Sequence, residues 1–432
     1  MEKKVYEEFN QLIYREQLNN GLSLQLMPMA GYHKTYAIFT TDFGSIDNKF
    51  VPYSGENVIE VPDGIAHFLE HKMFEKNGYD AFDLFGKLGA DSNAYTSFTQ
   101  TSYLFSTTNH LHENLDVLLD FVQEPYFSEQ TVQKEQGIIG QEIKMYDDDA
   151  SWRLYLGILG NLYPKDPMHI DIAGTTESIS RITPESLMAT YQTFYQPSNM
   201  NLFLTGNINP EEVREWVESN QAGKTFMPAK TPERKFELND PSAHDVIPFR
   251  SLNMDVARSK VIVGLRGINM PEPGEDLLKY KLTIDLLLDV LFDDTSDNYL
   301  RLYNNEVLDD SFAYNLEMQR DFYFAYFSSD TEQMERFADE IIAILESANQ
   351  QIDAARTRFN EIKNAELGRL IGLMDSPEAV ANHYAGKLFG GATLMDEIRI
   401  LRSIKLEDLY DAAEKFIVSQ GISVFQINPQ RH

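Results

Sequence analysis

Two histidines and a glutamate fall within the five consecutive residues His67-Phe68-Leu69-Glu70-His71. On a helix, positions i and i+4 share one face, so the imidazoles of His67 and His71 can point at one spot. Neutral imidazole is a natural zinc ligand, and Glu70 can approach the metal as a general base without being a ligand. The glutamate precedes the second histidine, an inverted order that occurs among catalytic zinc motifs. These residue types and their spacing therefore predict a metal site.

The alternative for this segment is a helix that carries two surface histidines and a nearby glutamate. Apolar residues surround the motif, among them Phe68, Leu69, Met73 and Phe74. A buried pair of histidines needs a polar partner, and this favours the metal site.

The third protein ligand has to come from elsewhere in the chain, because a catalytic zinc ion usually holds three protein ligands and one water. The chain has no cysteine, so the ligand should be a carboxylate or a third histidine. Glu135 and Glu142 are the best candidates, because their spacing of seven places them on one face of a helix predicted over 128–147. Ile138 and Ile139 indicate that this part of the helix is buried. From the residues alone, either glutamate could equally be a solvated surface acid.

The elements that position these residues follow from the pattern of apolar and turn-forming residues. Asp63 can cap a helix over about 64–76 that carries the histidines. Residues 91–107 are rich in Ser, Thr, Tyr and Phe, and predict a pair of strands. The proline-rich, charged stretch 223–249 is the best candidate for a linker.

The two halves of the chain contain a similar predicted strand–helix pattern. Residues 104–122 and 324–345 each read as a strand ending in Ser/Thr that leads into an amphipathic helix, at an offset of roughly half the chain. We therefore expect an α+β fold of two homologous domains related by duplication, each a mainly antiparallel sheet flanked by helices. The predicted ranges are 1–224 for the zinc-binding domain, 225–250 for the linker and 251–432 for a catalytically silent domain.

Composition limits the partners of the 432-residue chain. Its 37 Lys and Arg against 67 Asp and Glu give a net charge of −30, which disfavours nucleic acid and anionic membranes. The absence of cysteine fits a reducing compartment, and no signal peptide or transmembrane run is visible. We expect a cytoplasmic protein.

The H-F-L-E-H segment, followed by an E-x6-E helix from Glu135 to Glu142, resembles the pitrilysin, insulinase and mitochondrial-processing-peptidase family of zinc metallopeptidases, the inverzincins. The chain is most similar to bacterial two-domain members of this length. The resemblance implies that His67, His71 and Glu142 bind one Zn²⁺ per chain, that Glu70 is the catalytic base, and that Glu135 supports the site from behind.

The resemblance also implies residues that bind substrate. Asn93, Ala94 and Tyr95 match the family's edge strand beside zinc, where a peptide adds as an extra strand. Without the family, this segment would be an ordinary exposed strand. Tyr314 matches a tyrosine that helps to bind substrate, although it could equally be a tyrosine at the edge of the core. The arginine expected seven residues before it is Val307, so a cationic clamp from this position is in doubt.

The resemblance therefore implies a zinc metalloendopeptidase that hydrolyses peptides or small unfolded proteins bound in extended form. At half the length of the single-chain clamshell enzymes, the chain is expected to pair as a homodimer or as a heterodimer with a related chain. The alternative is a non-catalytic scaffold or partner subunit of a heteromeric complex, for which the complete histidine–glutamate set would be unnecessary. A zinc hydrolase of non-peptide amides is a further alternative.

Overall fold

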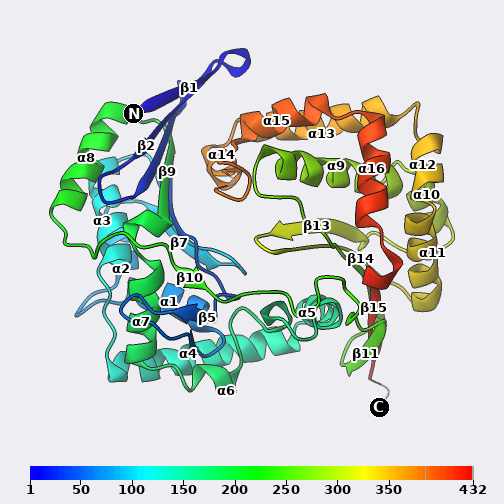
Figure 1. Cartoon of the computed structure of the whole chain (residues 1–432), viewed down its shortest axis with the longest axis horizontal. Helices are drawn as coiled ribbons and strands as arrows, with labels where there is room; N and C mark the ends of the chain where they lie inside the picture. The colour runs from blue at the N-terminus through cyan, green and yellow to red at the C-terminus, as the bar shows by residue number, and fades with distance from the viewer. Residues whose placement is uncertain (385, 431–432) are drawn as a thin grey trace. The chain divides into compact units, whose positions relative to one another are not determined.

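The computed structural model describes residues 1–384 and 386–430, which form two compact units (Figure 1). Unit 1 comprises Met1–Ile143, Asp171–Phe236 and Met374–Tyr384. Unit 2 comprises Lys144–Ile170, Glu237–Leu373 and Ala385–His432. Each unit is an α+β structure built on one main sheet.

The main sheet of unit 1 has seven strands in the order β1-β2-β3-β9-β4-β8-β7. All neighbouring pairs are antiparallel except β3 and β9, which are parallel. The strands are β1 (Glu2–Tyr6), β2 (Gln11–Gln17), β3 (Ser23–Pro28), β4 (Thr35–Thr41), β7 (Asp91–Thr96), β8 (Thr101–Thr107) and β9 (Met200–Gly206). A small second sheet joins β5 (Lys49–Val51), β6 (Ile59–Glu60) and β10 (Glu233–Arg234).

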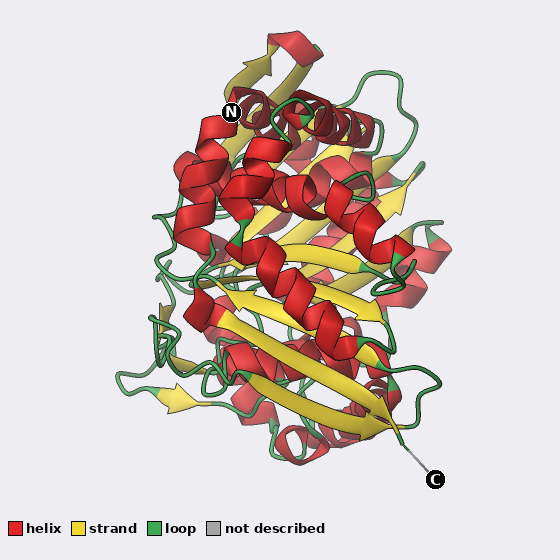
Figure 2. Cartoon of the chain, turned by 90° about the vertical axis from the view of Figure 1, so that its right-hand side faces the viewer, coloured by secondary structure: helices red, strands yellow, loops and turns green. Residues whose placement is uncertain are grey.

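The sheet of unit 2 has five strands in the order β11-β15-β12-β14-β13, and again one pair, β11 and β15, is parallel. The strands are β11 (Phe249–Met254), β12 (Lys260–Arg266), β13 (Ala313–Gln319), β14 (Phe322–Asp330) and β15 (Ile422–Pro429), the last of which leads to the C-terminus marked in Figure 2. In chain order both sheets read first-fifth-second-fourth-third, since β3-β9-β4-β8-β7 of unit 1 follows the same path. This shared topology confirms the predicted duplication of a mainly antiparallel fold.

Helices flank both sheets, as Figure 2 shows in red against the yellow strands. Unit 1 carries α1 (Ile65–Phe74), α2 (Ala81–Lys87), α3 (Leu111–Gln123), most of α4 (Glu129–Asp148), α6 (Thr176–Ile179), α7 (Pro184–Phe194), α8 (Pro210–Ala222) and α14 (Pro377–Asn382). Unit 2 carries α5 (Ala150–Leu162), α9 (Glu275–Phe292), α10 (Asp297–Asn304), α11 (Met334–Glu346), α12 (Ala348–Ala354), α13 (Phe359–Leu373), α15 (Leu394–Ser403) and α16 (Leu406–Phe416). The predicted strand pair and the two helices of the candidate site are confirmed as β7, β8, α1 and α4.

Each unit includes a short segment from the other half of the sequence. In unit 1, the segment from the second half covers the face of the sheet that lies opposite the main core. On strand β4, Ala37 and Phe39 face the main core, while Tyr36 points the opposite way and its hydroxyl donates to Asn382 on α14. In unit 2, α5 packs on β12 and β15. The units therefore differ from the predicted ranges by two exchanged segments, Lys144–Ile170 and Met374–Tyr384. Local sequence patterns do not predict that a segment from one half of the chain packs in the unit formed by the other half.

The start of α1 differs from the prediction. Asp63 does not cap the helix, and its carboxylate instead accepts a hydrogen bond of 2.9 Å from Asn48. Gly64 occupies the N-cap position with a φ of +88°, and a Cβ there would lie 2.4 Å from the carbonyl oxygen of Ala173. A glycine is required because the loop at Ala173 approaches too closely for any side chain.

Replacing Gly64 by alanine should lower the free energy of unfolding by at least about 1–2 kcal/mol, because the new Cβ meets both the positive φ and the Ala173 carbonyl. Urea denaturation followed by circular dichroism measures this. Gly137→Ala is the matched control: Gly137 is exposed on α4 with no atom within 4 Å of its Cβ position, and alanine there should stabilise the helix. Equal stability of Gly64→Ala and the wild type would contradict this account.

Candidate metal centre

Helix α1 presents three polar side chains on one face and buries the opposite one. Phe68, Leu69 and Met73 are fully buried in the core of unit 1. Their spacing fixes the rotation of the helix, so that His67 and His71 project together with their ring centroids 4.5 Å apart.

Helix α4 lies beside α1 (Figure 1) and presents two glutamates to the histidines. Ile139 and Glu135 are buried, as predicted for this part of the helix, but Ile138 is 47% exposed. The prediction that both isoleucines are buried was wrong for Ile138, because adjacent residues on a helix point about 100° apart. The seven-residue spacing still places Glu135 and Glu142 on one face.

Three side chains converge as candidate metal ligands: His67, His71 and Glu142. Nε2 of His67 lies 3.7 Å from Oε1 of Glu142, and Nε2 of His71 lies 3.6 Å from its Oε2. Ligand atoms bound to one zinc ion at 2.0–2.2 Å in tetrahedral geometry are separated by about 3.3–3.6 Å. Two imidazoles and one carboxylate with these separations fit a zinc ion with one further position for water.

Burial keeps the imidazole of His67 neutral, which is the form that binds metal. Its side chain is 12% exposed, and desolvation together with the neighbouring His71 lowers its pKa to about 3. Burial also disfavours the charged ring of His71, but the hydrogen bond and charge of Glu135, together with the charges of Glu70 and Glu142, outweigh it and raise the pKa of His71. The two rings thus differ in their electrostatic surroundings although they share one helix face.

Glu135 supports His71 rather than joining the candidate ligands. Its Oε1 lies 3.0 Å from Nδ1 of His71, so an Nδ1–H donates to the carboxylate and Nε2 keeps its lone pair on the side of Glu142. The side chain of Glu135 is 9% exposed, which shields this pairing from solvent. The geometry therefore separates the two glutamates that the residues alone left equivalent.

Replacing Glu135 by glutamine should weaken zinc affinity about 10- to 100-fold, because the neutral amide no longer polarises His71. Competition with a fluorescent zinc chelator measures the affinity. The matched control is Glu129→Gln at the exposed start of the same helix, which should bind zinc like the wild type. An unchanged affinity of Glu135→Gln would exclude the supporting role.

Glu70 projects beside the candidate ligands without joining them. Burial raises the pKa of its carboxyl, which is also hydrogen-bonded to Thr96: the hydroxyl of Thr96 donates to Oε2 over 2.6 Å. A carboxylate with a raised pKa, close to a metal site, is suited to accept and return a proton. The motif alone could not reveal the contact with Thr96, because it joins a helix to the end of a strand 26 residues away in the sequence.

The predicted substrate strand is β7, which carries Asn93, Ala94 and Tyr95. It is the last strand of its sheet and pairs with β8 alone among the described strands. Side chains alternate along it, with Asn93 exposed and Ala94 packed toward the core. An edge strand next to α1 is confirmed, and its binding of substrate stays a prediction.

Tyr314 lies in unit 2, where its hydroxyl donates to Oδ1 of Asp289 over 2.8 Å. Burial raises the pKa of Asp289 to about 7. Val307, at the position of the expected arginine, is fully buried and supplies no charge. The predicted role of Tyr314 in substrate binding stays a prediction.

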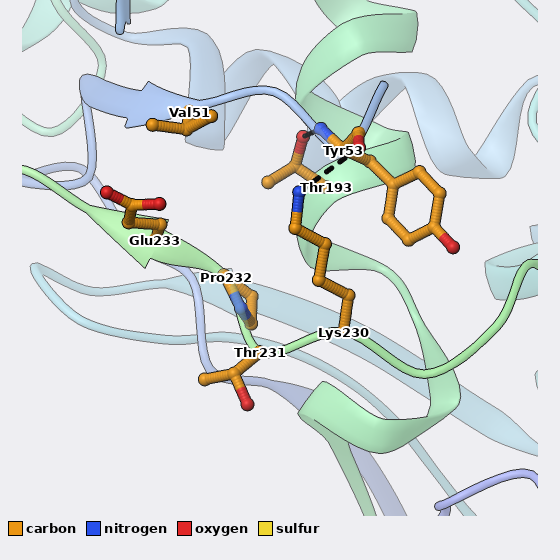
Figure 3. Close-up of a pocket in the computed structure, with 7 residues that line it drawn as sticks. All are labelled: Val51, Tyr53, Thr193, Lys230, Thr231, Pro232 and Glu233. Atoms are coloured by element: carbon orange, nitrogen blue, oxygen red, sulfur yellow. Dashed lines mark hydrogen bonds between the residues drawn. The ribbon is translucent and has the colours of Figure 1, made fainter. Parts of the chain in front are cut away.

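A shallow surface hollow elsewhere in unit 1 shares no residue with this centre (Figure 3). It lies between β5 and the segment before β10. The side chain of Lys230 crosses it to donate to the carbonyl oxygen of Tyr53, and the Tyr53 N–H donates to Thr193. These contacts are structural, since they join the 223–249 stretch to the body of unit 1.

The duplicated fold and the histidine helix facing a glutamate helix define an inverzincin-type protein. Comparisons with known proteins agree: residues 59–176 match "Insulinase (Peptidase family M16)" and residues 181–366 match "Peptidase M16 inactive domain". The chain is 42% identical to the uncharacterized zinc protease YmfH of Bacillus subtilis (strain 168), over 98% of both chains. It belongs to peptidase family M16.

Solved structures show the same fold. An M16-like peptidase from Alicyclobacillus acidocaldarius is 31% identical and superposes with a TM-score of 0.89, covering 97% of this chain and 99% of its own. A structure described as a peptidase M16 inactive domain, from Pseudomonas fluorescens, is 13% identical with a TM-score of 0.75 and covers 97% and 98% of the two chains. The latter supports the fold alone.

Proposed function

We propose that the chain is a zinc-dependent endopeptidase that hydrolyses peptides or small unfolded proteins. The observation that carries the proposal is the convergence of His67, His71 and Glu142 next to a partly buried carboxylate, Glu70, that is not one of the three. The name of the B. subtilis relative, a zinc protease, supports the choice of metal and of reaction.

His67, His71 and Glu142 would hold the ion, with Glu135 orienting His71. A zinc ion bound there would polarise the scissile carbonyl and make its water more acidic. Glu70 accepts a proton from the attacking water and then transfers it to the leaving amine, so that the carboxylate is regenerated at the end of the cycle. Each step uses a side chain already held in place by α1 or α4.

The edge of β7 that no other described strand pairs with supports extended peptides as the substrate class. A peptide that adds there pairs through its backbone N–H and C=O groups, which every peptide has, whatever its sequence. Asn93, Ala94 and Tyr95 would form this contact. Extended, unfolded peptides fit such an edge, whereas a small non-peptide amide would leave it unused.

The test is to incubate the purified chain with a mixed peptide pool, with and without a chelator, and to follow cleavage by mass spectrometry. We expect cleavage that stops with chelator and returns when zinc is added. Cleavage of small amides without cleavage of peptides would indicate the other hydrolase. Absence of cleavage by the zinc-loaded chain would indicate a scaffold.

The scaffold is the second candidate, because the fold also occurs in the P. fluorescens chain described as an inactive domain. In such a protein the same surfaces would hold a partner without chemistry. The complete set of His67, Glu70, His71 and Glu142 argues for the peptidase, since docking requires none of them.

We further propose that the chain acts in the cytoplasm as a homodimer or as a heterodimer with a related chain. The absence of cysteine supports a reducing compartment. In the described residues, no helix combines the length and apolarity needed to span a bilayer. Light scattering of the purified chain, alone and after co-expression with a related chain, tests the assembly.

A further inference from the structure

Thr96 is the last residue of β7, and its hydroxyl donates a short hydrogen bond of 2.6 Å to Oε2 of Glu70 on α1. Within the described chain this is the hydrogen bond that the Glu70 carboxylate forms. The contact joins the strand proposed to hold substrate to the carboxylate proposed to move the proton. What it does for that carboxylate is the inference, and it rests on the proposed function.

The Thr96 hydroxyl donates its proton to Glu70 rather than to its other neighbour. Thr96 has a second neighbour, the Oγ1 of Thr101, at the longer distance of 3.4 Å. The Thr101 hydroxyl donates its own proton to the carbonyl oxygen of Phe43 over 2.9 Å. A hydroxyl carries a single proton, and the carboxylate oxygen of Glu70 at 2.6 Å is a closer and stronger acceptor than the Thr101 hydroxyl at 3.4 Å, so the Thr96 proton is donated to Glu70.

The side chains around this contact are held by strand pairing, burial and hydrogen bonds. Thr96 and Thr101 are paired across β7 and β8, so the backbone holds the two hydroxyls in register. Close to Glu70 lie Tyr103 and Tyr195, both fully buried, with their hydroxyls 2.9 Å apart. The Thr96 hydroxyl that donates to Glu70 therefore lies at a strand end whose position is fixed by pairing with β8 and by the packing around it.

A glutamate side chain has three rotatable bonds, and a carboxylate held by one oxygen loses most of that freedom. We propose that Thr96 is a positioning residue: it fixes Oε2 of Glu70 so that the other oxygen is left to exchange the proton. The acid–base step then depends on a hydroxyl that is not one of the three candidate metal ligands.

Thr96→Val keeps the shape of the side chain and removes the hydroxyl. We expect kcat on a mixture of internally quenched fluorescent peptides to fall about 10- to 100-fold, with KM and zinc content little changed. Thr96→Ser restores the donor and should recover most of the activity. A merely structural role would predict no such rescue, and would move KM or zinc content together with kcat.

Thr35→Val is the matched control. Thr35 is a buried threonine of the same sheet, donates to the carbonyl oxygen of Asn207 over 3.0 Å, and sits at the end of β4 opposite to the Thr41–Thr101 pair. It should retain the kcat of the wild type. A Thr96→Val enzyme with wild-type kcat, or one that loses no more than Thr35→Val, would overturn the inference.

A second readout does not depend on activity. Crystal structures of the zinc-loaded wild type and Thr96→Val should show one Glu70 rotamer within 3.2 Å of Thr96 Oγ1 in the former, and several Glu70 rotamers in the latter. An identical, single Glu70 rotamer in both would overturn the inference. If the wild type cleaves no peptide, the proposed function fails, and the crystallographic comparison still decides the role of Thr96.

Discussion

Replacing Glu70 by glutamine will reduce peptide cleavage by about 10³-fold while one zinc ion per chain is retained. General acid–base catalysis contributes about 10²–10⁴-fold, and a neutral amide can neither take up nor return the proton. The amide oxygen can still accept the hydrogen bond from Thr96, and none of the three candidate ligands is altered. Steady-state kinetics together with elemental analysis of the same preparation measure both quantities.

The matched control is Glu60→Gln, because the side chain of Glu60 is 66% exposed and outside the candidate centre. It should keep both zinc and activity. A zinc-loaded Glu70→Gln protein that cleaves peptides as fast as this control would disprove the assignment of the base.

Replacing Glu142 by glutamine will abolish stable zinc retention, with a loss of affinity of at least about 100-fold. The change exchanges a charged ligand between the two imidazoles for a weakly donating amide, and should cost more than altering a residue behind the ligands. Zinc content after dialysis against a weak chelator measures it. We expect the order wild type, Glu135→Gln, Glu142→Gln, from most to least zinc retained.

The folded state should survive this change, since Glu142 lies on a solvent-accessible part of α4 and its side chain is 22% exposed. Circular dichroism melting of the metal-free proteins provides the control. Full zinc retention by Glu142→Gln would mean that Glu135 or another residue is the third ligand.

The sequence could point to these candidate residues because their spacing along the helices is local. A helical turn separates His67 from His71, and two helical turns separate Glu135 from Glu142, so their relative directions follow from helix geometry alone. Which of the two glutamates joins the histidines depends on how α4 packs against α1. Neither the spacing of the glutamates nor the pattern of apolar residues around them predicts this packing. The family resemblance favours Glu142, whose carboxylate lies near both imidazoles in the structure, and its role as a ligand stays a prediction.

The start of α1 and the hydrogen bond between Thr96 and Glu70 could be found only in the structure. Asp63 is a good capping residue by type, yet the close approach of Ala173 to Gly64 decides the conformation there. Thr96 is one of many threonines in a β-rich segment, and nothing in its neighbours along the chain points to Glu70. Both depend on contacts between elements far apart in sequence, where local patterns carry no information.

The exchanged segments affect how the chain can be cut and assembled. The sheet face that carries Tyr36 and Phe203 is covered by residues 374–384, with the ring of Tyr384 5.3 Å from that of Phe203. During synthesis this aromatic surface stays open until more than 370 residues have been made, a long interval in which a chaperone or a second nascent chain could bind it. A protease that nicks the proline-rich stretch 223–249 would yield two fragments, each of which contributes strands or helices to both units. Such fragments would hold together without a covalent link, so an intact elution profile would not prove an intact backbone.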